Sequence, residues 1–353
     1  MNTTTGNTEI KSLTPQGDTT NPSYGQLPGE PPSTLRRLFF GAAGLRAGWS
    51  LLIFCALFGG LLFAGNAIAR KFVPSARNQP AELSLRFGLI AESLPFLAVL
   101  LITWIMSKIE RRPNSVYGFG DSRRLPHFLA GLVWGVTCLS LLVFTLWKAG
   151  LLVFDSRLIS GSAIFVYGAL WLFGFLLVGL LEEYLTRGYL LYTLTRGLAG
   201  IYQWAFKTRH SAALGFWTAA LGISILFGLG HGSNPGESPI GLLSAGLAGM
   251  VFCLSLWRTG SLWWAIGFHA SWDWAQSFLY GVADSGLMIE HHLFATHPVG
   301  KPVLSGGTTG PEGSIVILGI MVLIIFIILF TLPRTSESYA LKLPAHLRET
   351  GAM

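Results

Sequence analysis

Residues 168–191 read GALWLFGFLLVGLLEEYLTRGYLL, and this stretch decides the class of the fold. A helix needs roughly 20 consecutive, mostly apolar residues to cross a bilayer, and this stretch supplies them. Two adjacent carboxylates, Glu182 and Glu183, and then Arg187 interrupt the apolar run without ending it. The stretch therefore predicts a membrane-spanning helix that carries ionisable groups.

Similar apolar runs recur along the whole chain. Hydrophobic residues make up 51% of the 353 positions and charged residues only 12%, with a mean hydropathy of +0.54. Soluble domains carry about 25% charged residues. The chain is therefore predicted to be all-α, a polytopic integral membrane helix bundle of about eight transmembrane helices. The predicted spans are 47–69, 87–106, 128–147, about 165–193, 212–230, 239–257, 261–281 and 314–332.

Most segments outside these spans are short and polar, and residues 282–313 are predicted to form the one long loop between spans. Residues 1–35 are rich in Thr, Pro, Gly, Ser and Asn, which is typical of a disordered N-terminal tail. Residues 36–333 form the predicted transmembrane domain, and residues 334–353 form a C-terminal tail. The N-terminus lacks the basic and short apolar regions of a cleavable signal peptide.

The net charge of +7 is concentrated at the ends of the predicted spans, as in KIERRPNS (108–115) and DSRRLPH (121–127). This distribution suits contact with anionic lipid headgroups and excludes nucleic acid as a partner. Cytoplasmic connections carry an excess of Lys and Arg. With eight spans, most of the 24 basic residues fall on one side if both termini are cytoplasmic. We therefore expect both termini in the cytoplasm and a bacterial-type plasma membrane.

Ionisable residues within the spans are functional candidates, because burying a charge in a bilayer is costly. Glu183 and Arg187 are four residues apart on one helical face and can pair. Glu182 lies about 100° around the helix from Glu183, so it can face a cavity instead. A buried salt-bridge network that leaves Glu182 without a role is the alternative. Glu92, in the second span, is interpreted as interfacial or paired with its own helix.

Two further spans bring imidazoles. Phe227 and His231 are one turn apart at the end of the fifth span, and His269 and Asp273 are one turn apart in the seventh. A carboxylate can orient an imidazole ring and fix its tautomer. Each feature alone also fits a helix cap or a buried structural pair. Together with Glu182 they predict a polar, water-filled pocket suited to general base catalysis, oxyanion stabilisation or zinc ligation.

The three motifs, in order, resemble those of the CPBP intramembrane proteases. The matching patterns are EExxxR (Glu182, Glu183, Arg187), FxxxH (Phe227, His231) and HxxxD (His269, Asp273). This family comprises the type-2 CAAX prenyl endopeptidases and bacterial relatives called abortive-infection or Abi proteins. The resemblance covers about residues 115–281, the predicted protease core.

The resemblance implies an intramembrane endopeptidase that cleaves membrane-associated or lipidated substrates. Glu182 would activate the attacking water with help from His231, and His269 and Asp273 would line the oxyanion side. Glu183 and Arg187 would hold the helix. The family often has Asn at the last position; Asp273 cannot donate an amide hydrogen bond, so orienting His269 fits it better. A mechanism without a cofactor is preferred, and zinc held by Glu182, His231 and His269 is the alternative.

Other classes of protein fit less well. The sequence contains no HExxH or GxSG motif, and its one GxGD, at 118–121, falls in a basic connection between spans. A proton-coupled transporter would also need buried acids and histidines, but no duplicated halves are visible. A non-proteolytic scaffold or immunity protein with the same pocket is the remaining alternative.

The depth of Glu182 in the bilayer depends on where the fourth span ends. If its helix continues to about residue 194, Glu182 lies near the middle of the bilayer, within reach of His231 and His269. Residues 195–210, TRGLAGIYQWAFKTRH, are predicted to form an amphipathic connector on the membrane surface, with a lid or lateral gate for substrate as the alternative.

Overall fold

The structure is a computed structural model that describes residues 34–41, 44–72 and 82–332 and the single positions 339, 343, 344 and 347. These residues belong to two units. The first is described only by α1 (Thr34–Phe39), and every other element belongs to the second. The predicted disordered tail lies outside the described residues, except that residues 34 and 35 begin α1. Most of the predicted C-terminal tail also lies outside them.

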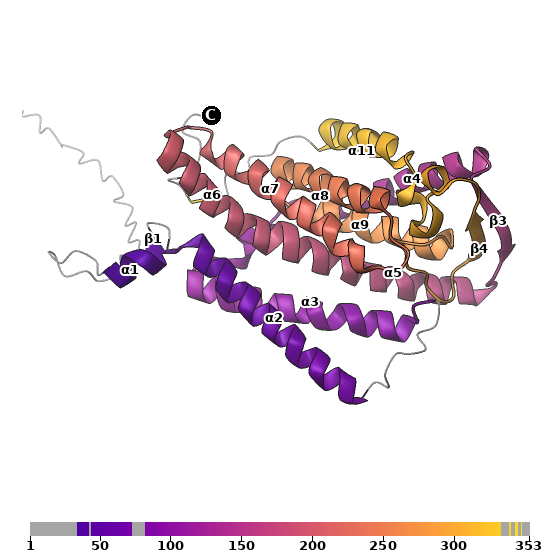
Figure 1. Cartoon of the computed structure of the whole chain (residues 1–353), viewed down its shortest axis with the longest axis horizontal. Helices are drawn as coiled ribbons and strands as arrows, with labels where there is room; N and C mark the ends of the chain where they lie inside the picture. Colours follow the sequence, from indigo (N-terminus) through magenta and orange to yellow (C-terminus); the bar gives the residue numbers. More distant parts are fainter. Residues whose placement is uncertain are drawn as a thin grey trace, which may run out of the picture. The chain divides into compact units, whose positions relative to one another are not determined.

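Helices dominate the second unit (Figure 1). Strands β1 (Phe40–Gly41) and β2 (Gly44–Leu45) form a short antiparallel pair before them. A π-helical turn, Tyr184–Leu190, joins α5 to α6, and a second one, Ala275–Leu279, extends α9. The helices are α2 (Ala47–Phe72), α3 (Leu85–Glu110), α4 (Arg124–Lys148), α5 (Ser162–Glu183), α6 (Leu191–Phe206), α7 (Ser211–Gly230), α8 (Pro239–Thr259), α9 (Trp263–Trp274), α10 (Pro302–Ser305) and α11 (Ile317–Thr331).

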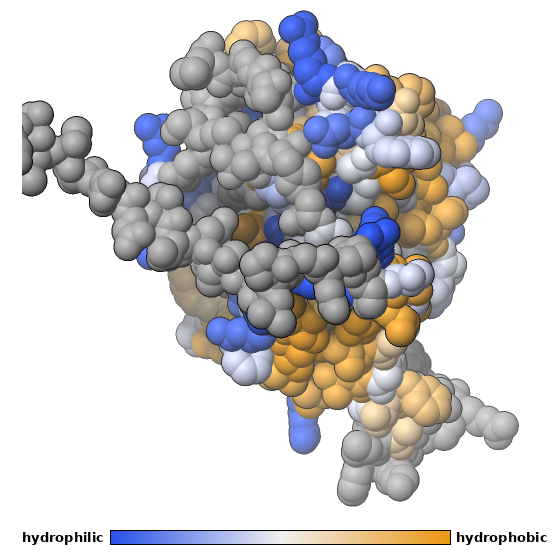
Figure 2. Space-filling view, turned by 90° about the vertical axis from the view of Figure 1, so that its left-hand side faces the viewer, coloured by the Kyte–Doolittle hydropathy of each residue, from blue (hydrophilic) through white to orange (hydrophobic). Residues whose placement is uncertain are grey.

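The predicted helical membrane bundle is confirmed. Within the described residues, 6 helices are long and apolar enough to cross a membrane, and they match the first six predicted spans. Helices also occupy the last two predicted spans, but they are shorter, with 12 residues in α9 and 15 in α11. Figure 2 shows hydrophobic side chains over the flank of the bundle and hydrophilic ones gathered near the helix ends. Large exposed side chains such as Phe63 and Phe165 suit contact with lipid.

The fourth span is longer than the sequence predicts. Residues Ser162–Phe206 form 45 residues of continuous helix, which correspond to about 65 Å at 1.5 Å per residue. The prediction of a surface connector over 195–210 is wrong, because its first twelve residues continue α6 and pack against α7. Arg196 and Ala199 are buried there. Gly215 of α7 permits the close approach, since a Cβ at that position would lie 2.6 Å from the Ala199 nitrogen.

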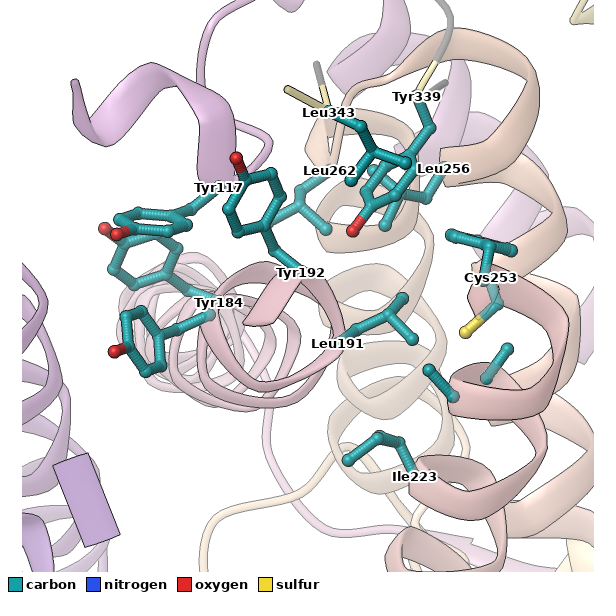
Figure 3. Packing of buried hydrophobic residues seen from close by; sticks show 14 of the residues in the cluster. Tyr117, Tyr184, Leu191, Tyr192, Ile223, Cys253, Leu256, Leu262, Tyr339 and Leu343 are labelled. Carbon is teal, nitrogen blue, oxygen red and sulfur yellow. The ribbon is translucent and has the colours of Figure 1, made fainter. Parts of the chain in front are cut away.

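An aromatic cluster fills the bundle at the end where α6 and α8 finish (Figure 3). Tyr117 packs edge-on against Tyr192, with ring centroids 5.4 Å apart, and Tyr192 packs in turn against Tyr339. Leu256 and Leu262 complete the same core. Tyr339 is 1% exposed, so part of the predicted C-terminal tail belongs to the core of this domain.

The opposite end of the bundle carries a folded cap made of connecting segments. Strand β3 (Leu152–Arg157) pairs antiparallel with β4 (Phe294–Pro298), at the right of Figure 1. The Asn234 side-chain amide donates to the Ser285 carbonyl at 2.9 Å, which ties the α7–α8 connection to the segment after α9. Gly286, with φ +82°, lies so close to Gly236 that a Cβ would stand 2.6 Å from its backbone. The long segment 282–313 is therefore built into the fold.

Candidate active site

A cavity of about 580 Å³ lies within the bundle, bounded by residues of α3, α5, α7, α8, α9 and α11 and by the cap. Most of its wall is apolar, as in ligand pockets generally. Carboxyl groups and imidazoles supply most of the polarity, and no Lys or Arg of the described residues lines it. The titratable residues in the wall are Glu92, Glu182, His231, His269, Asp273, Asp284 and Glu312.

The two adjacent glutamates have different surroundings. Glu183 is fully buried, and its Oε1 accepts from Arg187 Nη1 and from His269 Nδ1, each at 3.0 Å. Glu182 lines the cavity, its side chain is 29% exposed, and its Oε2 has no hydrogen-bond partner among the described residues. The sequence-based division of roles, with Glu183 paired and Glu182 facing a cavity, matches this geometry.

Arg187 is held by an aromatic ring as well as by Glu183. Its guanidinium carbon lies 4.0 Å from the centroid of the Phe227 ring, and the side chain is completely buried. A cation over an aromatic face gains more when water is excluded, up to about 2 kcal/mol. Phe227, the first residue of the FxxxH motif, thus links α7 to the Glu183–Arg187 pair of the long helix.

His269 lies among three carboxylates. Its Nδ1 faces Glu183, and its Nε2 lies 3.4 Å from Asp273 Oδ2 and 3.7 Å from Glu182 Oε2. The last distance is longer than a hydrogen bond. Because both ring nitrogens face carboxylates, a protonated imidazolium suits this position. The expected role of Asp273 in orienting His269 is consistent with their one-turn separation.

His231 enters the cavity from the end of α7, where the helix gives way to the turn His231–Ser233. Its Nδ1–H donates to the Phe227 carbonyl at 2.8 Å, since a carbonyl oxygen can only accept. This fixes the tautomer with the lone pair on Nε2, which is the form that can accept a proton. No partner of Nε2 is found among the described residues.

A π-helical turn follows each of two site segments. Tyr184–Leu190 begins directly after Glu183, and Ala275–Leu279 begins two residues after Asp273. Such turns are rare, and they are frequent at functional sites because the extra residue re-aims the side chains around it. The Thr186 hydroxyl donates to the Glu182 carbonyl in the first turn and also accepts from Arg187 Nη1. Both turns therefore lie directly beside site residues and can set the direction of their side chains.

Sequence reasoning missed part of the cavity wall. Glu92 of α3, which was predicted to be interfacial or paired with its own helix, lines the cavity and lies close enough to Glu182 for the two carboxylates to repel each other. No hydrogen bond to its carboxyl group is found among the described residues. An unpaired acid in a predicted span was the signal that could have found it.

Asp284 and Glu312 bring two further carboxyl groups from the cap. Gln276 donates to Glu312 at 2.6 Å, and Ser277 donates to Asp284 at 3.3 Å. Burial raises the pKa of Asp284 well above its usual range, and the nearby carboxylates of Asp273 and Glu312 raise it further. The sequence gives no local signal for these two residues, because the segment 282–313 reads as a loop.

Zinc ligation was the alternative for three of the predicted residues. Within the described residues, no group of three or more His, Cys, Asp and Glu side chains is arranged to hold a metal ion. Glu182, His231 and His269 line one cavity but do not form such a group. The mechanism proposed below therefore assigns no chemical step to a metal.

Comparison with known proteins finds one family whose model resembles part of the chain. Residues 165–275 match the family model described as type II CAAX prenyl endopeptidase Rce1-like. The chain thus contains a segment, called here the Rce1-like domain, that is similar to this family. This domain holds Glu182, Glu183, Arg187, His231, His269 and Asp273, whereas Glu92, Asp284 and Glu312 lie outside it. Neither curated proteins nor solved structures include a match to the chain.

The Rce1-like domain covers the part of the bundle from α5 to the end of α9. It is narrower than the core of about 115–281 that the motifs predict. The family is one of membrane proteases, so the chain carries a protease-type domain in an integral membrane protein.

Proposed function

We propose that the protein is an intramembrane endopeptidase that hydrolyses peptide bonds of membrane-associated or lipidated substrates. One observation carries the proposal: Glu182 lines the cavity with its side chain 29% exposed and without a hydrogen bond to its Oε2 among the described residues, whereas Glu183, beside it, is fully buried and accepts two hydrogen bonds. Holding a carboxylate inside the membrane without a strong partner costs free energy, and such a carboxylate is suited to take a proton from water.

In the proposed reaction, Glu182 removes a proton from a water molecule that attacks the substrate carbonyl. His231 lines the cavity and, with Nδ1 bound to the Phe227 carbonyl, uses its Nε2 lone pair to help to hold that water. The new C–O bond forms as the carbonyl becomes an oxyanion. The proton held by Glu182 then passes to the leaving amine as the C–N bond breaks.

His269 supports the oxyanion side of the site. Glu183 fixes the ring through Nδ1, so the Nε2–H can donate toward the developing negative charge. Asp273, 3.4 Å from the same Nε2, orients the ring and stabilises the imidazolium. Arg187 and Phe227 position Glu183 and make no contact with the reacting atoms in this scheme.

Access from the bilayer fits a substrate that is anchored in the membrane. Leu226 lines the cavity and is 66% exposed on the flank of α7, so the cavity reaches the surface that faces lipid. α3 packs mainly against α2 and α5, and α7 packs mainly against α6 and α8. The wall between α3 and α7 is therefore not sealed by helix packing.

The proposal is tested by comparing new peptide termini in membranes from cells that express wild-type protein or Glu182→Ala. Termini present only with the wild type support hydrolysis, provided that both proteins accumulate and melt alike. Glu82→Gln, which alters an exposed carboxylate outside the cavity, is the matched control and should resemble the wild type. Identical termini from wild type and Glu182→Ala would refute the proposal, and proton flux dependent on Glu182 would favour a transporter.

A further inference from the structure

The two ends of the bundle differ in charge, and the cavity is closed at one end and open at the other. This difference bears on the side of the membrane from which substrates enter the cavity. One end of the bundle is tightly packed by the aromatic cluster (Figure 3). The cluster consists of Tyr117, Tyr192, Leu256, Leu262 and Tyr339. None of these five residues lines the cavity. On this side the cavity stops at Leu190 and Ile223, whose side chains lie between it and the cluster.

The cavity extends in the other direction, toward the cap. From Ile223 to His231 it follows α7 for about 12 Å, at 1.5 Å per residue. Beyond α7 its wall is formed by Asn234 and by Ser285 and Leu287 of the cap. Leu287 is 40% exposed, so the cavity reaches the aqueous surface at this end.

Basic residues gather at the closed end. Figure 2, which views this end, shows hydrophilic side chains around the helix termini. The described basic residues at the closed end are Arg46, Lys108, Arg111, Arg112, Arg123, Arg124, Lys207, Arg209 and Arg258.

Among the described residues, fewer basic ones flank the open end than the closed end, and acidic residues accompany them there. The described basic residues there are Arg86, Lys148, Arg157 and Lys301, and Arg70 and Lys71 lie in the last turn of α2. The acidic residues there are Glu82, Asp155, Glu237, Asp284, Glu290 and Glu312. Connections on the cytoplasmic side of a membrane are enriched in Lys and Arg. The closed, basic end is therefore the cytoplasmic one.

We infer that the cavity opens on the non-cytoplasmic face of the membrane, so that its substrates are membrane-anchored proteins whose scissile segment lies on that side. The inference about substrates rests on the proposed function, whereas the orientation does not. A cytoplasmic C-terminal peptide would have to pass the aromatic cluster or cross the bilayer to reach Glu182. A segment on the non-cytoplasmic side reaches it through the mouth beside Leu287 or laterally past Leu226.

Orientation can be measured without any assay of activity. Ser233→Cys at the open end and Ser122→Cys at the closed end are matched changes of exposed serines, made in the full chain after Cys55→Ala removes the exposed native thiol. A membrane-impermeant maleimide applied to intact bacterial spheroplasts should label Ser233→Cys, and should label Ser122→Cys only after lysis. Labelling of Ser122→Cys before lysis would overturn the inference.

The substrate side needs a second measurement. Two reporters share one transmembrane anchor and one candidate cleavage segment, placed either on the non-cytoplasmic or on the cytoplasmic side. Cleavage of the first alone is expected, and cleavage of the second alone would overturn the inference. If labelling is as expected but neither reporter is cut in any tested sequence, the proposed protease function fails and the orientation stands.

Discussion

Replacing Arg187 with Met tests whether the buried ion pair holds the site helix together. Arg187 and Glu183 are both 0% exposed, so the change leaves a carboxylate without its cation in a site from which water is excluded. Removing one partner of a buried pair costs about 3–5 kcal/mol. His269 still donates to Glu183 at 3.0 Å and offsets part of this loss. The loss of the cation–π interaction with Phe227, at 4.0 Å, destabilises the protein further. We therefore expect the free energy of unfolding to fall by about 3 kcal/mol or more.

Thermal unfolding of the purified protein in detergent measures this cost. At about 2 °C per kcal/mol for a chain of this size, the Arg187→Met protein should melt at least roughly 6 °C below the wild type. Arg124→Met, which changes an exposed arginine at the start of α4, is the matched control and should melt within about 1 °C of it. The double variant Glu183→Gln/Arg187→Met should recover at least half of the loss, because no buried charge is then uncompensated. A drop of less than about 2 °C for Arg187→Met would refute the reasoning.

Three further outcomes follow from the cavity wall. Burial raises the pKa of Asp284, so its contribution to stability is complete below the ordinary aspartate value of about 4 and is lost as the pH rises through the raised folded value. Wild-type protein should therefore melt at a lower temperature at pH 8 than at pH 5, and Asp284→Asn should reduce that difference; an unchanged difference contradicts this. Glu92→Gln should raise the melting temperature by a few degrees, since an unpartnered carboxyl in a span costs about 1 kcal/mol or more, and a fall would show that Glu92 is stabilised by contacts not seen here. Zinc chelators should leave cleavage unchanged, whereas a loss that added zinc restores would contradict a mechanism without metal.

The membrane helix bundle can be predicted from the sequence because the length of an apolar run is a local property of the chain. Each predicted span needs only its own run of residues to exceed the bilayer thickness, and helices occupy all eight stretches. The short helices α9 and α11 show the limit of this rule. Composition reports that a segment is apolar, but the point at which the helix ends depends on the surrounding structure.

The geometry around Glu182 could also be anticipated from spacing. The i,i+4 relation pairs Glu183 with Arg187 and His269 with Asp273, and the 100° step turns Glu182 away from Glu183. The link between His269 and Glu183 could not be predicted, because it joins residues 86 positions apart on two helices. The same holds for Glu92, which reaches the cavity only through the packing of α3 on α5.

The segments 195–210 and 282–313 were the least predictable. The first looked amphipathic, but its polar residues Thr195 and Arg196 are buried. Arg196 donates to the Leu45 carbonyl at 2.8 Å and to Glu110 at 3.3 Å. The second has the glycines and prolines of a loop, yet it folds through contacts with the α7–α8 connection. In both cases long-range hydrogen bonds outweigh the local pattern.

The most direct test of the central claim is the rate at which purified Glu182→Gln cleaves a substrate identified from the membrane comparison. Glutamine keeps the size of the side chain but cannot take a proton from water. The account predicts a loss of at least about 100-fold relative to the wild type, with an unchanged melting temperature, and no loss for the exposed control Glu82→Gln. Turnover by folded Glu182→Gln within a few-fold of the wild-type rate would contradict the claim that Glu182 activates the attacking water.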